Sequence, residues 1–179
     1  MLFLSAIISG CATYSVSTVK DKADGSAVYR VDGFPTGYPL KSRSGAIYFQ
    51  PQKKTRPDGT AEYGVQVEYR GNSRLFIERG ETLDVNVDGR IRKYSGEGSR
   101  EGREAGASDA VDAGAGTVSE TAYYPMGTDV LRSVAQGNEI YVTVKGKIIQ
   151  VSGRFTGGNK EAVARFLAEY GDGPAVRLK

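Results

Sequence analysis

Leu83-Asp-Val-Asn-Val-Asp-Gly-Arg-Ile-Arg-Lys-Tyr94 has the residue pattern of a β-hairpin. Its first half alternates apolar Leu83, Val85 and Val87 with polar residues, which is the period of a strand with one buried face. Asp88-Gly89 follows, and this pair is favoured in two-residue type I′ hairpin turns. The stretch therefore predicts two antiparallel strands joined by a tight turn.

The same alternation extends upstream. Val65, Val67 and Tyr69 alternate with polar residues, and a turn at 71–73 leads into a further strand expected over 74–79. The chain from Ala61 to Tyr94 therefore predicts an antiparallel meander. Shorter strands are expected over 27–31 and over 46–50, where Pro51 would end the second one.

A short helix and a hairpin are expected after the meander. Thr128 or Asp129 can cap the helix, in which Val130, Leu131 and Val134 form an apolar stripe before Gly137. The hairpin would turn about Gly146, with strands over 139–145 and 147–156. Its inward side chains are expected to be Ile140, Val142 and Val144 on the first strand, then Ile149, Val151 and Phe155 on the second.

The clearest helical pattern lies near the C-terminus. Asn159 is a good N-cap, and Gly171 is placed for a left-handed C-cap. Between them, apolar side chains follow the spacing of one helix face: Val163, Phe166, Leu167 and Tyr170.

These elements predict an α+β fold. It would hold a largely antiparallel β-sheet (meander plus C-terminal hairpin) and two helices, with the C-terminal helix packed on the sheet. A β-sandwich with a terminal helix is the alternative. We expect one domain over 27–171, a mobile loop at 95–117 that is too poor in large apolar residues to order itself, and a tail at 172–179.

The N-terminus carries a different signal, Met1-Leu-Phe-Leu-Ser-Ala-Ile-Ile-Ser-Gly-Cys-Ala12. The apolar run over 2–8 is too short to span a bilayer, but its length suits the apolar region of a signal peptide. Ile8-Ser-Gly-Cys11 resembles the lipobox of bacterial prolipoproteins. The resemblance implies removal of residues 1–10 as a signal peptide, and attachment of a diacylglyceryl group and fatty acids such as palmitate at Cys11.

The resemblance also carries an expected location. No Lys or Arg precedes the apolar run, so the natural start of the signal peptide is expected upstream of Met1. Residues 11–26 would form the lipidated N-terminus and a tether or first strand. Ala12, where Asp would favour inner-membrane retention, implies the outer membrane of a Gram-negative bacterium, facing the periplasm, rather than the inner membrane.

Composition narrows the range of functions. The 24 basic and 21 acidic residues are spread along the chain, unlike the clustered basic face that nucleic acids require. The chain has no histidine, which is the usual general base, and its sole cysteine is the acylation candidate. We therefore expect no enzyme activity, no metal and no cofactor. An unrecognised hydrolase using Asp84 and Asp88 is one alternative.

Tyrosine is the enriched residue, with eleven copies. Its apolar ring and polar hydroxyl suit strands, and tyrosine is also enriched at binding hot spots. The leading hypothesis is a lipid-anchored, non-enzymatic module that binds another envelope protein. The alternative is a glycan- or peptidoglycan-binding module with a tyrosine-lined face.

Overall fold

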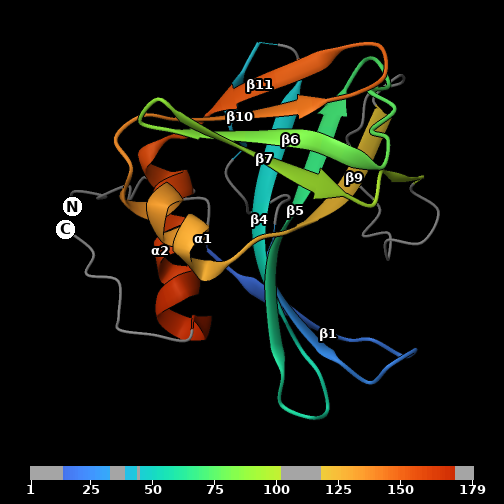
Figure 1. Ribbon diagram of the computed structural model, residues 1–179, viewed down its shortest axis with the longest axis vertical. Coiled ribbons are helices and arrows are strands. Elements are labelled where there is room, and N and C mark those ends of the chain that lie inside the picture. Colours follow the sequence, from blue (N-terminus) through green and yellow to red (C-terminus); the bar gives the residue numbers. More distant parts are fainter. Residues whose placement is uncertain (1–13, 33–38, 44, 102–117, 172–179) are drawn as a thin grey trace, which may run out of the picture.

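The structure is a computed structural model that describes residues 14–32, 39–43, 45–101 and 118–171 (Figure 1). Two antiparallel sheets and two helices make up this part of the chain, so the prediction of an α+β fold is confirmed. The elements in chain order are β1 (Val16–Lys20), β2 (Ala27–Val31), β3 (Lys41–Ser42), β4 (Ala46–Thr55), β5 (Ala61–Gly71), β6 (Gly80–Val87), β7 (Arg90–Gly96), β8 (Arg100–Glu101), β9 (Val118–Pro125), α1 (Thr128–Gln136), β10 (Ile140–Lys145), β11 (Gln150–Arg154) and α2 (Gly157–Tyr170).

The larger sheet, sheet A, has the strand order β1-β2-β4-β5-β9-β8, with the long strands β4 and β5 at its centre. Pro51 was expected to end β4, but the strand continues to Thr55. The pairing of β2 with β4 stops at Gln52. Pro51 therefore lies just beyond the last of these pairs, where no strand on that side requires a proline N–H.

The smaller sheet, sheet B, has the order β3-β11-β10-β6-β7. Its β6–β7 hairpin is the one predicted from the sequence, with Leu83 opposite Tyr94 and Val87 opposite Arg90. Asp88 and Gly89 have φ values of 51° and 85°, as a type I′ turn requires at both central positions.

The two sheets contribute to one core. An isolated bridge between Leu40 and Ile47 connects the β3 side of sheet B to β4 of sheet A. On the other side, the hydroxyls of Thr82 (β6) and Tyr124 (β9) share a 3.0 Å hydrogen bond. The core combines side chains from both sheets and both helices, including Ile47, Val65, Tyr124, Val142, Leu131 and Phe166.

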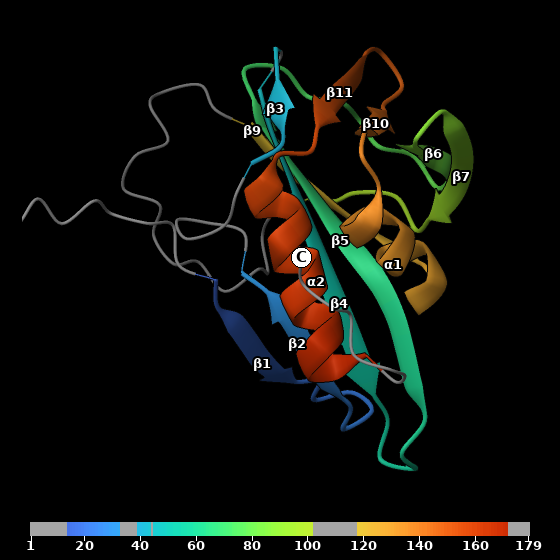
Figure 2. The same ribbon diagram turned by 90° about the vertical axis from the view of Figure 1, so that its left-hand side faces the viewer.

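Both helices bury the predicted apolar stripes except Tyr170, which is partly exposed, and α2 lies along β4 as expected for a helix packed on the sheet (Figure 2). Their caps differ from the prediction. Gly127 precedes α1 without a side-chain cap. The N-cap of α2 is Thr156, whose hydroxyl forms a capping box with Asn159 three residues later. Gly171 ends α2 with φ of −77°, so it does not adopt the left-handed C-cap.

The meander predicted over Ala61 to Tyr94 is wrong as one sheet, because β5 pairs in sheet A with β4 and β9 whereas β6 and β7 belong to sheet B. Two predicted strand segments are also wrong. Residues 74–78 form no strand, because their backbone amides bind a side chain instead of a neighbouring strand. Ile149 lies in the β10–β11 turn and is 38% exposed, since strand pairing ends at Lys145 opposite Gln150. Val151 and Phe155 are buried as expected.

The remaining predictions concern the loop at 95–117, the two ends of the chain and the tether. The structure places the first residues of the predicted loop at 95–117 in β7, β8 and the bend between them, and 102–117 lie outside the described residues. The signal peptide, Cys11 and the tail at 172–179 also lie outside them. Within the predicted tether, residues 16–20 form a strand.

Candidate functional site

Asp84 and Asp88, the residues of the hydrolase alternative, are both engaged in structural contacts. The Asp84 carboxylate forms an ion pair with Lys145 at 2.6 Å. The Asp88 carboxylate accepts the backbone N–H groups of Asn138 at 3.0 Å and Glu139 at 2.8 Å. Asp84 lies within β6 and Asp88 in the turn that follows it, so the two carboxylates hold different contacts in place.

The described part of the chain offers neither a metal site nor a membrane-spanning helix. No group of three or more His, Cys, Asp or Glu side chains gathers there in a way that could hold a metal ion. No helix there is long and apolar enough to cross a bilayer.

A row of polar side chains crosses the face of sheet A that points away from the core. Arg30 donates to Gln66 at 2.7 Å, and Gln66 donates to Gln50 at 3.2 Å. Further along the same face, Glu68 accepts from Arg70 at 2.6 Å and from Ser119 at 2.9 Å. These hydrogen bonds connect β2, β4, β5 and β9, so the row of polar side chains stabilises the pairing of these strands.

The tyrosines do not form one continuous face. Tyr48, Tyr69 and Tyr124 are buried, and Tyr141 lies on sheet B. Four others gather where α2 ends over sheet A, and all four are partly exposed: Tyr14, Tyr29, Tyr63 and Tyr170. We call this group the tyrosine cluster.

Cross-strand pairing and the end of α2 hold the tyrosine cluster together. Tyr29 is opposite Lys53, and Lys53 is opposite Tyr63, so the three share one face of sheet A. The Tyr170 carbonyl accepts from the Tyr63 hydroxyl at 2.7 Å and from the Lys53 ammonium at 3.1 Å. The rings of Tyr29 and Tyr170 lie 5.2 Å apart. These contacts satisfy a carbonyl at the helix end and give the rings a fixed orientation.

Tyr14 extends the tyrosine cluster along α2. Its hydroxyl donates to Glu169 at 3.4 Å, and its ring lies 5.8 Å from the Arg165 guanidinium carbon. Partial burial, together with the Glu169 carboxylate, raises the pKa of Tyr14 above its ordinary value. The Tyr14 hydroxyl, like any tyrosine neutral at physiological pH, therefore also stays neutral to a higher pH than an ordinary tyrosine.

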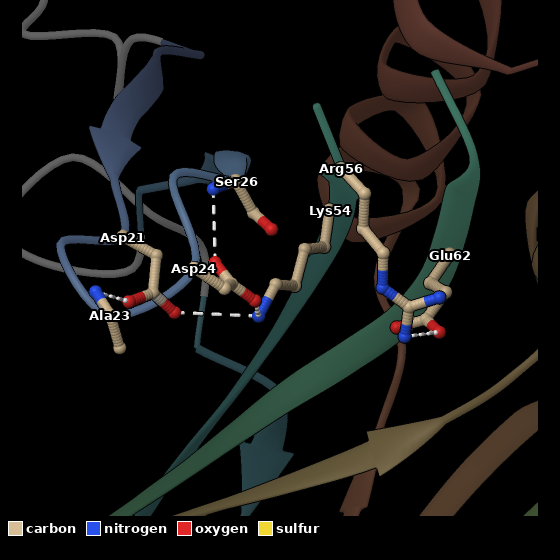
Figure 3. A network of polar contacts seen from close by, with 7 residues as sticks. All are labelled: Asp21, Ala23, Asp24, Ser26, Lys54, Arg56 and Glu62. Carbon is tan, nitrogen blue, oxygen red and sulfur yellow. Dashed lines mark hydrogen bonds and ion pairs between the residues drawn. The ribbon is translucent and has the colours of Figure 1, made fainter. Parts of the chain in front are cut away.

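A network of charges ties the β1–β2 turn to β4 (Figure 3). Lys54 forms ion pairs with Asp24 at 2.8 Å and with Asp21 at 3.3 Å. The Asp24 carboxylate also accepts the Ser26 N–H at 2.9 Å, and Arg56 pairs with Glu62 beside it. The hydrogen bond from Lys54, followed by that from Ser26, lowers the pKa of Asp24.

We expect Lys54→Ala to raise the pKa of Asp24 toward its ordinary value. A carboxyl whose pKa is lower in the folded state stabilises the fold above its unfolded pKa of about 3.9. That contribution is lost as the pH falls through the folded pKa. The destabilisation caused by Lys54→Ala should therefore be present at pH 7 and shrink at strongly acidic pH. Carboxyl NMR titration and urea unfolding measure the two effects, and an unchanged Asp24 pKa would contradict the assignment.

The most exposed apolar group of the described chain lies where two loops meet. Phe76 in the β5–β6 connection is 43% exposed, and Ile148 and Ile149 in the β10–β11 turn are 69% and 38% exposed. The Lys147 N–H donates to the carbonyls of Leu75 at 2.9 Å and Phe76 at 3.1 Å, so the loops are in contact. We call these three side chains the apolar tip.

The backbone of the apolar tip is tightly held. A Cβ on Gly146 would lie 1.9 Å from the Leu75 carbonyl oxygen, so only glycine permits this approach. Phe76 has φ of 55°, a conformation that costs a bulky residue on the order of 1–3 kcal/mol. The Glu120 carboxylate accepts the N–H groups of Leu75 and Ile77 on either side, and of Phe76 itself.

Comparison of the chain with protein-family models, curated proteins and solved structures finds no significant match.

The candidate site therefore rests on geometry alone. The sequence offered a tyrosine-lined face as an alternative hypothesis, and it did not show which tyrosines would gather. It missed the apolar tip altogether, because Ile149 was assigned to the core and residues 74–79 to a strand. The one local signal was Gly-Lys-Ile-Ile at 146–149, where two large apolar residues adjoin a turn glycine.

Proposed function

We propose that the chain is a lipid-anchored envelope lipoprotein, held in the membrane by acylated Cys11, whose globular domain is a non-enzymatic protein-interaction module. The outer membrane of a Gram-negative bacterium, with the domain facing the periplasm, is the proposed location. The lipobox-like residues Ile8 to Cys11 support the anchor.

The tyrosine cluster is the observation that carries the interaction role. Tyrosine rings supply large amphipathic contact area with few rotatable bonds, and they are enriched among hot-spot residues. Here hydrogen bonds to the Tyr170 carbonyl and ring contacts hold the rings before any partner binds. Pre-organised side chains lose little entropy on binding, so this surface suits a partner protein.

The engagement of the acidic side chains supports a non-enzymatic role. Asp84 is paired with Lys145, Asp88 caps backbone amides, and Glu120 binds the 75–77 segment. Each of these carboxylates contributes to holding elements together rather than facing a shared reaction centre.

A peptidoglycan- or glycan-binding module is the second candidate, and the same tyrosine cluster favours it. Sugar rings present flat apolar faces edged by hydroxyls, which match tyrosine rings beside a lysine. Tyr29, Lys53 and Tyr63 lie side by side in one cross-strand row.

Site-specific photocrosslinking in intact cells distinguishes the two candidates. A photoreactive amino acid at Thr18, an exposed position opposite Tyr29, should capture one envelope protein. The same probe at Lys93, exposed on sheet B, is the matched control and should capture none. Tyr29→Ala should weaken the isolated complex by about 30-fold, the effect of removing a hot-spot side chain, whereas Tyr141→Ala on sheet B should have little effect.

Sedimentation with purified peptidoglycan supplies the other arm of the test. Binding that is lost with Tyr29→Ala and kept with Tyr141→Ala would favour the glycan candidate. Adducts at Lys93 but not at Thr18 would show that the tyrosine cluster is not the interaction surface.

A further inference from the structure

We propose that the apolar tip, Phe76 with Ile148 and Ile149, inserts into the surface of an anionic phospholipid bilayer. The tip would thus be a membrane contact of the folded domain itself, separate from the proposed acyl anchor at Cys11. Its two loops lie together at one end of the molecule, in the upper part of Figure 1, where the turn between β10 and β11 meets the connection from β5 to β6.

The first line of support is the way in which the fold displays these side chains. Leu75 and Ile77, on either side of Phe76, are 0% and 3% exposed, while Phe76 itself is 43% exposed. In a regular half-buried strand, the residues between the buried positions are usually polar. Here the residue between buried Leu75 and Ile77 is the aromatic Phe76. The Glu120 carboxylate binds three successive N–H groups at 2.5, 3.1 and 3.1 Å and holds the left-handed Phe76 in this position.

The second line of support is the concentration of exposed apolar residues. Five large apolar side chains are exposed in the described part of the chain, and three of them form the apolar tip. The other two, Val19 and Ile91, lie on β1 and β7. Scattered single residues need no explanation, whereas these three lie on two loops that contact each other.

The third line of support is charge. The segments 72–79 and 146–149 carry three basic residues, Arg74, Arg79 and Lys147, and one acidic residue, Glu78. Lys147 lies 3.6 Å from Glu78, and both side chains remain more than 60% exposed. Apolar side chains flanked by basic residues match an interface where anionic headgroups lie above acyl chains.

The size of the apolar tip favours a bilayer over a protein partner. Three partly exposed side chains offer apolar area on the order of 250 Å², far less than the roughly 800 Å² per partner of a stable protein interface. Insertion into a bilayer requires only the apolar side chains and the basic residues around them. Its binding free energy reinforces that of any other membrane contact of the same chain.

A single tryptophan tests the insertion directly, because the chain has none. Ile148→Trp would place this reporter at the most exposed position of the tip. Ile91→Trp is the matched control: Ile91 is 62% exposed but pairs with Asn86 near the 88–89 turn, at the far end of β6 from the tip. Both variants are made in the full chain and mixed with vesicles of phosphatidylglycerol and phosphatidylcholine that carry brominated acyl chains.

With I148W, we expect a blue-shifted emission and quenching by the brominated chains at least twofold stronger than with I91W. The quenching should fall on vesicles of phosphatidylcholine alone, and also when Lys147→Glu is added to I148W. Equal quenching of I148W and I91W would overturn the proposal. So would a photocrosslinker at Ile148 that captures a protein in intact cells rather than lipid, because the tip would then be a protein-binding surface.

The test is independent of the proposed function. The same measurements in a Cys11→Ser background remove the candidate acylation site and leave the tip intact. Tip quenching that persists there separates insertion of the folded domain from anchoring by Cys11, so either proposal can fail without the other.

Discussion

Glu120→Ala should lower the free energy of unfolding by about 3–5 kcal/mol, the largest stability change that we expect from one substitution on the face of β9. Glu120 is 7% exposed, and its two carboxylate oxygens accept the N–H groups of three consecutive residues, Leu75, Phe76 and Ile77. Alanine would leave these amides without their acceptor in a largely buried setting, and each such loss costs about 1–3 kcal/mol. Urea unfolding followed by circular dichroism measures the change.

The conservative variant refines this prediction. Glu120→Gln retains one oxygen, which can still accept two N–H groups, but its amide nitrogen cannot accept the third. The free energy of unfolding of Glu120→Gln should therefore lie between those of the wild type and Glu120→Ala. Amide hydrogen exchange should speed up most at residues 75–77, because these amides lose their partner.

Glu62→Ala provides the control for Glu120. Glu62 pairs with Arg56 at an exposed position where both side chains are over 40% accessible, and such pairs contribute at most about 1 kcal/mol. If Glu62→Ala and Glu120→Ala destabilise the protein equally, the binding of the 75–77 segment by Glu120 does not have the importance that we assign to it.

Cys11→Ser should abolish fatty-acid labelling and release the protein from membranes, if our proposal of a lipid anchor is correct. Each acyl methylene buried in a bilayer contributes about 0.8 kcal/mol, so one chain binds marginally and two or more bind stably. Serine has no thiol to accept the diacylglyceryl group. Metabolic labelling with a fatty acid, followed by fractionation in high salt, measures both effects.

Ser5→Ala is the matched control, since it changes one small residue in the same apolar run and leaves Ser9, Gly10 and Cys11 intact. It should label and fractionate like wild type. Labelling that persists in the Cys11→Ser protein would show that the acyl groups are attached elsewhere or that the lipobox reading is incorrect. Weak membrane association without labelling would be consistent with the separate contact proposed for the apolar tip.

Elements with strong local signals were predictable. The 83–94 hairpin has the alternation, the Asp88-Gly89 turn and the register expected from its residues. Apart from the partly exposed Tyr170, the apolar stripes of α1 and α2 are buried where the helical period placed them. These features depend on neighbours within a few positions along the chain, which is the range over which periodicity and turn preferences act.

The errors share a different origin. Residues 74–78 have a strand-like composition, but Glu120 lies more than 40 positions away, and its carboxylate takes the amides that a strand would pair. β4 continues through Pro51 because its pairing with β5 runs without a break from Ala46 to Thr55, while no β2 residue pairs with Pro51. In both cases a non-local contact outweighs the local preference, which is weaker for strands than for helices.

The two candidate surfaces, the tyrosine cluster and the apolar tip, also depend on contacts between distant segments. The sequence showed that tyrosines are abundant, but pairing between β2, β4 and β5 and the end of α2 select the members of the tyrosine cluster. Burial removes Tyr48, Tyr69 and Tyr124 from the surface, and Tyr141 lies on the other sheet. The apolar tip had no reliable sequence signal, because exposed and buried isoleucines look alike until strand register is known.

Short-range patterns in the sequence were enough for the α+β class, the type I′ hairpin and the helix faces, and they make Cys11 a candidate for acylation that stays a prediction. Each of these depends on residue type and short spacing. The tertiary structure alone decided that Glu120 holds Phe76 outward, that the β10–β11 turn leaves Ile148 and Ile149 exposed, and which tyrosines meet around Lys53. These outcomes depend on which distant segments satisfy buried amides and fill the core, and that competition is settled only when the whole chain has packed.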